Sequence, residues 1–437
     1  MGRFSGALLA LAAVLVSPNA AYGQDNEAVL AAQQVFVLAE AYQRDSRTGD
    51  AEALLEALTR DRDPEIRAEA RFRLGRARMA HQDFEGAAEA FAALLEEKPD
   101  AQPARLALAQ ALAAGGKPGA AARQLRRARA GGLPEDVQRL VDRFGDLLRR
   151  SRPYGINVEL GLAPDSNINQ ATSSRTLDIG GFPLALDESG RATSGVGLTA
   201  SADAFATVPL GSGLSWVNRI IGIGSFYRQE RFNDLILSAS SGPEFNLGKA
   251  VVRPAATYSW RQVGGKRYSH GFGSSLQVLA PIGGASQVGG SISISDQDYR
   301  IPEQGGLQLA AAISYERALS PRLYGRMEMT VQRVTAEADA YASTSFGSSL
   351  SLSRDIGAAT VYAQAGYLRT EGDGPFALFG KARADDRVDL SFGAAWKRWS
   401  IGGLTPIVRL QQTFNSSPLD LYRFKRTRAE IVMTERF

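Results

Sequence analysis

The sequence contains no cysteine and, among 437 residues, only two histidines. The absence of cysteine excludes disulfides, thiolate metal sites, cysteine nucleophiles and a lipid attached through an N-terminal cysteine. His81 and His270 are too few for a histidine-rich metal site. We therefore expect no bound metal and no cofactor.

The sequence also lacks an excess of charge of one sign. Its 50 basic residues nearly balance its 46 acidic residues, which leaves a net charge of +4. No basic run is interleaved with aromatic residues, as a nucleic-acid groove would require. We therefore expect no nucleic-acid partner.

Long apolar runs are missing except near the start, where Ala7 to Val16 is uninterrupted. Arg3 precedes this run, and Ala21-Tyr22-Gly23 follows it with the small-x-small pattern of a signal-peptide cleavage site. The run is too short for a spanning helix, which needs about 20 residues. Residues 1–23 are predicted to be a signal peptide, and any membrane domain would have to be a β-barrel.

Residues 24–152 are rich in Ala, Leu, Arg and Glu, which favour helices. Small and large apolar residues recur at the spacing of a tetratricopeptide repeat, about 34 residues. The predicted packing residues are Leu74, Gly75, Ala87, Phe91, Leu108, Ala109, Ala121 and Leu125. We predict a helical solenoid, which either binds an extended or helical peptide on its concave face or acts as a spacer.

The end of this region carries a run of arginines, from Arg123, Arg126 and Arg127 to Arg152. Such a run is usually a solvated helix face. The alternative is a surface that contacts anionic headgroups where the chain enters a membrane.

After Pro153 the pattern changes to period two. In 388–398, Val388, Leu390 and Phe392 alternate with Asp389 and Ser391, as in a strand between two unlike environments. We count about fourteen such segments, each long enough to cross a bilayer, and an even number suits a closed antiparallel barrel. The predicted fold is a periplasmic tetratricopeptide-type solenoid followed by a 14-stranded outer-membrane β-barrel at 153–437.

The connections between these segments alternate in length. Short turns such as 208–213 and 281–285 alternate with longer polar loops such as 165–194, 297–305 and 370–385. Outer-membrane barrels have short periplasmic turns and long external loops, whereas a soluble β-sandwich would not sort its loops in this way. We expect the protein in the outer membrane of a Gram-negative bacterium, with the helical domain in the periplasm.

The polar faces of the predicted strands carry charges of both signs, which we expect to line the lumen. These residues are Arg326, Glu328, Asp389, Lys397, Arg409, Arg428 and Glu430. Mixed signs argue against a strongly ion-selective pore. They fit either a polar interior whose charged groups are satisfied by water and by one another, or a wall that contacts a protein passing through the barrel.

Two motifs could carry other chemistry. His270 lies near Ser274, but a serine hydrolase also needs a group that orients the ring, and none is close in sequence. We therefore expect no enzyme activity. Asp165, Asn167 and Asn169 alternate in 163–172, but a calcium loop needs more carboxylates, so turn chemistry is the preferred interpretation.

The signal peptide, the helical repeats, the barrel and the entry segment "YGINVELGLAPDSNINQAT" (154–172) together resemble the surface lipoprotein assembly modifier family. The resemblance implies an outer-membrane factor that helps particular proteins, chiefly lipoproteins, reach the cell surface or the medium. It implies that the repeats receive the secreted or lipidated client or a periplasmic chaperone, and that the barrel assists passage. The alternatives are a passive pore with a helical appendage and a cell-envelope scaffold.

The last segment, "RTRAEIVMTERF", alternates as a closing strand should, and we expect it to pair with the first strand. Its terminal Phe437 resembles the signal read by barrel-insertion machinery. Deletion of Phe437 is predicted to lower assembly into the outer membrane while the helical domain still folds. Heat-modifiable mobility in gels measures the assembled barrel, and a normal yield from the truncated protein would contradict the prediction.

Overall fold

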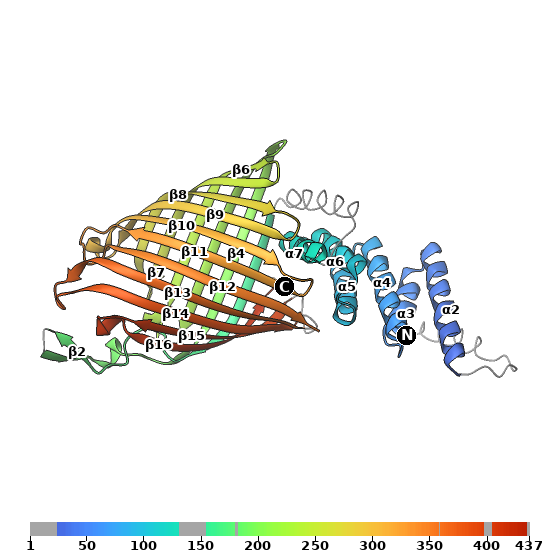
Figure 1. Ribbon diagram of the computed structural model, residues 1–437, viewed down its shortest axis with the longest axis horizontal. Helices are drawn as coiled ribbons and strands as arrows, with labels where there is room; N and C mark the ends of the chain where they lie inside the picture. The colour runs from blue at the N-terminus through green and yellow to red at the C-terminus, as the bar shows by residue number, and fades with distance from the viewer. Residues whose placement is uncertain (1–23, 131–153, 180–181, 358, 397–403, 435–437) are drawn as a thin grey trace. The chain divides into compact units, whose positions relative to one another are not determined.

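A computed structural model describes residues 24–130, 154–179, 182–357, 359–396 and 404–434 (Figure 1). The predicted signal peptide, Lys397 and Phe437 lie outside the described residues. The chain divides into two compact units, residues 1–82 and 83–437, and each is described by itself.

Within the described residues, the first unit contains the helices α2 (Gln24–Arg44), α3 (Thr48–Leu58) and α4 (Pro64–Ala80). Helix α4 begins at Pro64, which suits the first turn because its missing N–H needs no partner there. The Asp63 side chain caps this helix by accepting a 2.8 Å hydrogen bond from the Glu65 N–H. Leu55, Leu74 and Gly75 are buried in this unit.

The second unit begins with α5 (Phe84–Glu97), α6 (Gln102–Ala114) and α7 (Pro118–Ala130). Asp83 caps α5 through the Gly86 N–H at 3.0 Å. The predicted packing residues of this unit are all buried: Ala87, Phe91, Leu108, Ala109, Ala121 and Leu125. Ala109, Ala121 and Leu125 belong to one cluster, so their small side chains let α6 and α7 pack closely. Among the helices within the described ranges, none is long and apolar enough to span a membrane.

The remainder of the second unit is a closed antiparallel barrel, formed by fourteen of the described strands. The strands are β1 (Tyr154–Asp165), β4 (Gly195–Gly211), β5 (Leu214–Tyr227), β6 (Asp234–Leu247), β7 (Ala250–Val263), β8 (Lys266–Ile282), β9 (Ser286–Tyr299), β10 (Gly306–Ala318), β11 (Leu323–Val334), β12 (Ser343–Ile356), β13 (Ala359–Phe376), β14 (Lys381–Trp396), β15 (Thr405–Ser416) and β16 (Phe424–Thr434). Each pairs with its neighbours in sequence, and β16 pairs with β1 to close the barrel. The predicted fourteen-stranded antiparallel barrel, preceded by helices, is confirmed.

Two features of the connections differ from the expectation. The segment 370–385, expected as a long loop, is mostly strand, because β13 and β14 extend beyond the predicted ends. The long connection 166–194 contains a small hairpin, β2 (Thr176–Ile179) and β3 (Phe182–Ala185). These strands have only four residues each, which is too short to produce a clear alternation in sequence.

Side chains alternate between the two faces of the barrel wall. On β11, Met327, Met329 and Val331 are exposed at 51%, 58% and 39%, whereas Arg326 and Glu328 occupy the other face. Large apolar side chains exposed over most strands suit contact with hydrocarbon rather than water. The face that carries Met327 is therefore the outer face.

Two strand glycines provide a test of how tightly the barrel is packed. A Cβ at Gly273 on β8 would lie 2.2 Å from the backbone oxygen of Ile294, so the strand would have to move. A Cβ at Gly290 on β9 would meet only one atom, at 4.0 Å. We predict that Gly273→Ala lowers the folded, heat-modifiable fraction, with a cost of about 1–3 kcal/mol. Gly290→Ala is the matched control, and equal loss in both variants would contradict the prediction.

Candidate functional site

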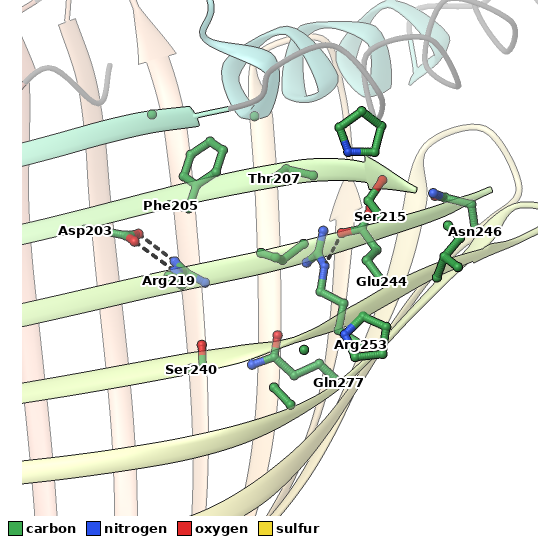
Figure 2. A pocket seen from close by; sticks show the side chains of 18 of the residues that line it. Asp203, Phe205, Thr207, Ser215, Arg219, Ser240, Glu244, Asn246, Arg253 and Gln277 are labelled. Carbon is green, nitrogen blue, oxygen red and sulfur yellow. Dashed lines mark hydrogen bonds and ion pairs between the residues drawn. The ribbon is translucent and has the colours of Figure 1, made fainter. Parts of the chain in front are cut away.

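A hollow of about 820 Å³ lies at the end of the barrel where the helices of the second unit approach it (Figure 2). Residues of β1 and β4–β8 line it, together with the start of α7 and the turn before it. Gly116 in that turn has a φ of +76°, a left-handed conformation that glycine adopts without strain. We call this space the rim hollow.

Four of the charged side chains that line the rim hollow form two ion pairs. Arg219 donates to both carboxylate oxygens of Asp203 at 2.8 and 2.6 Å, and Arg253 donates to Glu244 (Figure 2). Each pair joins side chains on adjacent strands. A bidentate guanidinium–carboxylate pair is strong and fixed in orientation. The wall is therefore polar, but these four charges cancel in pairs.

A second space of about 1150 Å³ lies beside the rim hollow, and we call it the helix-side hollow. One of its walls is a face of α5 with Phe84, Ala88 and Glu89, and another is formed by strands β10–β13. The two hollows share six lining residues: Gly116, Lys117, Ala120, Arg123, Ile156 and Asn157. They are therefore adjoining parts of one space that runs from helix α5 to the barrel wall.

Two arginines of the predicted basic run hold α7 against the barrel. Arg127 is 6% exposed and forms an ion pair with Asp355 on β12. Arg126 donates to Gln287 and to the Tyr324 hydroxyl at 3.2 and 3.3 Å. The interpretation of this run as a solvated helix face is thus wrong for Arg126 and Arg127.

Arg105 on α6 lies behind this contact and is 3% exposed. It donates to the Pro99 carbonyl oxygen and to Gln124 at 3.0 Å. Burial lowers the pKa of Arg105 to about 10, and the positive charge of Arg127 adds to the lowering. The two guanidinium groups therefore compete for nearby negative charge, and Asp355 partly offsets their repulsion.

The charged residues predicted to line the lumen form ion pairs where the structure describes them. Arg326 pairs with Glu328 and, at 3.0 Å, with Glu316. Glu430 accepts from both Arg409 and Arg428, at 3.1 and 2.6 Å. Asp389 pairs with Arg387 at 2.8 Å. Arg326 also lines the helix-side hollow.

The predicted barrel-entry motif ties the first strand to the last. Asp165 pairs with Arg426 at 2.9 Å, and its side chain is fully buried. Asn167 donates to the Lys425 carbonyl oxygen at 3.1 Å and also bonds both backbone groups of Ala171 nearby. Asn169 bonds the backbone of Arg191 and Thr193. The bonds between Asn167 and Ala171 are local turn bonds, whereas the other bonds join residues that are far apart in the chain.

His270 does have an acid nearby, because Asp298 on the adjacent strand lies 3.5 Å from its Nδ1. The sequence did not reveal this neighbour, which strand register brings close. However, His270 and Ser274 share the outer face of β8 with the exposed Phe272 and Leu276. That face suits an interfacial histidine rather than an enclosed catalytic site.

Several residues of the site were not singled out in the sequence, notably Asp203, Arg219, Glu244, Arg253 and Asp355. Asp203 and Arg219 lie on different strands, as do Glu244 and Arg253, and only the strand register brings each pair close. The partner of Asp355 lies on α7. Period-two patterning could place these charged residues on the polar face of their strands, but it could not identify the partner of each ion pair.

Breaking the contact between Arg127 and Asp355 is predicted to destabilise helices α5–α7. Removing one member of a buried pair leaves an uncompensated charge, at a cost of about 3–5 kcal/mol. Arg127→Ala should lower the urea midpoint of the helical circular-dichroism signal in the purified full chain, while the barrel stays heat-modifiable. The double variant with Asp355→Ala should recover part of the loss.

Arg44→Ala is the matched control, because Arg44 forms an exposed i,i+4 pair with Glu40. A loss in Arg127→Ala no larger than in this control would contradict the prediction.

Solved structures similar to the chain are outer-membrane barrels. They include Salmonella typhi OmpF in complex with daunomycin (7% identity, 64% of this chain and 97% of that chain, TM-score 0.37) and a mutant of Vibrio cholerae OmpT that lacks loop L8 (10%, 64% and 98%, TM-score 0.36). The toluene transporter TodX of Pseudomonas putida is another (9%, 65% and 90%, TM-score 0.35). At such low identity and TM-score, these likenesses carry no argument about this chain. A comparison with curated proteins gave no match.

The model of one family, "Surface lipoprotein assembly modifier", matches residues 154–437. The match covers the whole barrel, from the first residue of β1 to the end of the chain. The combination of helices and a closed fourteen-strand barrel agrees with it. The chain therefore belongs to the surface lipoprotein assembly modifier family and is an outer-membrane β-barrel protein.

Proposed function

We propose that this protein moves a client polypeptide across the outer membrane, through the continuous space formed by the helix-side hollow and the rim hollow. Family membership supports a role in surface lipoprotein assembly. The observation that carries the path is the set of six residues shared by the two hollows. The helices lie in the periplasm in this proposal, and the client is a secreted or lipidated protein.

The chemistry of the walls suits an extended chain of varied sequence. The α5 wall contributes Ala88 and Ala92, which are small, and Glu85 and Glu89, which are acidic. Lys117 contributes a basic group at the junction. In the rim hollow, Asp203–Arg219 and Glu244–Arg253 are paired across strands, so the wall there offers hydrogen bonds without a strong field of one sign. No chemical step is part of this role.

The first test is deletion of the protein in cells that carry a neighbouring lipoprotein gene. Protease shaving of intact cells reads the surface exposure of each candidate client. Deletion is expected to remove the exposure of at least one lipoprotein, with its total amount unchanged. Unchanged exposure of every outer-membrane lipoprotein would overturn the proposal.

The second test concerns the path itself. Ala120 lines both hollows, so Ala120→Trp would fill their junction. We expect at least a tenfold loss of client display with a normal amount of heat-modifiable barrel. Ala114→Trp at the exposed end of α6 is the matched control, because Ala114 lines neither hollow. Equal display in the two variants would contradict the path.

Planar-bilayer recordings separate this function from a passive pore. The translocation proposal predicts no steady, solute-selective current from the intact protein. A steady current that Ala120→Trp abolishes, with client display unchanged, would favour the pore instead.

A further inference from the structure

The two hollows of the proposed client path lie in one half of the barrel interior. The rim hollow reaches Asp203 on β4, Ile221 on β5 and Ser275 on β8, each near the middle of its strand. The helix-side hollow reaches Gln364 on β13, short of the middle of that strand. The long connection that carries the β2–β3 hairpin lies at the opposite end of the barrel (Figure 1). We call the half of the interior at that opposite end the far half.

Polar side chains of the inner wall are buried in the far half. Four of them, on β9, β13, β14 and β15, are between 2% and 8% exposed: Gln297, Thr370, Asp385 and Asn415. Strand alternation and register place them on the same face as Arg326, which lines the helix-side hollow. A water-filled lumen would leave such groups exposed. Other parts of the chain therefore cover the inner wall here.

The connection between β15 and β16, residues 417–423, provides part of this cover. The Asn415 side chain on the inner wall donates a 2.6 Å hydrogen bond to the Tyr422 carbonyl oxygen, so the connection turns back along the wall. Leu419 in this connection is 1% exposed, and strand β2 also contacts the connection. A connection that extended into water would not bury a leucine in this way. We call residues 417–423 the inner loop.

Tyr422 joins the inner loop to a row of aromatic side chains. Its ring centroid lies 5.9 Å from that of Phe376 at the end of β13, and Phe376 packs edge-on against Tyr341 at 5.4 Å. The Arg383 guanidinium lies 4.6 Å from the centroid of the Tyr422 ring, within the range of a cation–π contact. Tyr341 belongs to the connection between β11 and β12, so separate parts of the chain meet in this row.

The row extends toward the opposite wall of the barrel. In the ring of fourteen strands, β8 is seven places from β15, which puts these two strands on opposite sides. Burial raises the pKa of Tyr422, and both Tyr341 and Tyr268 on β8 add to the rise, so Tyr268 lies near Tyr422 although its strand is opposite. Tyr268 also packs edge-on against Tyr299 at 5.6 Å. Aromatic side chains therefore cross the interior instead of following one wall.

We infer that the far half of the lumen is closed by a movable gate, made of the inner loop and the aromatic side chains Tyr268, Tyr341, Phe376 and Tyr422. The gate blocks water and ions in the resting protein, and the inner loop swings away from the wall when a polypeptide leaves. The identity of what passes the gate rests on the proposed function, whereas the closure itself does not. We call this set of residues the aromatic gate.

The contacts that hold the aromatic gate can open without unfolding the barrel. They are ring–ring contacts, a cation–π contact and a hydrogen bond from Asn415, and each of these is individually weak. The backbone ladders of β13, β14, β15 and β16 continue behind them. Movement of the inner loop therefore leaves the wall intact, whereas a plug built from strand pairs could move only by breaking its ladders.

Planar-bilayer recordings of the purified full-length protein test the closure. The double variant Phe376→Ala/Tyr422→Ala removes the middle of the row, and we expect at least a tenfold larger mean ion current than in the wild-type protein. The matched control is Tyr258→Ala/Phe272→Ala, which removes an aromatic pair at 4.7 Å on the outer face of the barrel. The control should leave the current at the wild-type level. Heat-modifiable mobility confirms that each variant has folded.

A cysteine reporter tests the position of the inner loop, because the chain has no cysteine of its own. Leu419→Cys is expected to react slowly with a membrane-impermeant maleimide added to intact cells, and at least fivefold faster in the Phe376→Ala/Tyr422→Ala background. An equal labelling rate in the two backgrounds, or an equal current in the gate and control variants, would overturn the inference. Client display is measured in the same strains, so failure of the gate and failure of the proposed function are separate results.

Discussion

The structure depends on one pairing, between the first strand and the last. Backbone polar groups in a bilayer have no water to bond, so a sheet can span it only if its two edges close on each other. Residues 159–162 of β1 pair with 431–434 of β16, and Gly161 allows a close approach to Val432. The ladder skips Ala163 and Pro164 and resumes where Asp165 pairs with Arg428. There the side chains of Asp165 and Asn167 also bond Arg426 and the Lys425 carbonyl oxygen, which strengthens the closure.

The closed barrel also brings the charged side chains of neighbouring strands together on its inner face. Arginine and acidic residues from adjacent strands face one another, as Arg219 does with Asp203 and Arg409 with Glu430. Such pairs leave a wall with many hydrogen-bonding groups and little net charge. This is a suitable surface for a passing polypeptide of any sequence, and it is a poor filter for ions of one sign.

The helices of the second unit are attached through charge rather than through a broad apolar interface. Arg126 and Arg127 reach β9, β11 and β12, whereas the apolar side chains of α6 and α7 pack mainly on each other. A contact made from a few ion pairs leaves open space around it, which is why the two hollows adjoin at the start of α7.

The sequence by itself determined the class of the fold, since period-two segments of bilayer length and helix-forming repeats are local properties. It also placed Arg326, Arg409 and Glu430 on the polar strand faces, because alternation requires only neighbouring residues. Only the tertiary structure decided which charges pair and that Arg127 is buried against Asp355. Register joins residues far apart in the chain, and no periodicity within a single strand encodes its partner's position.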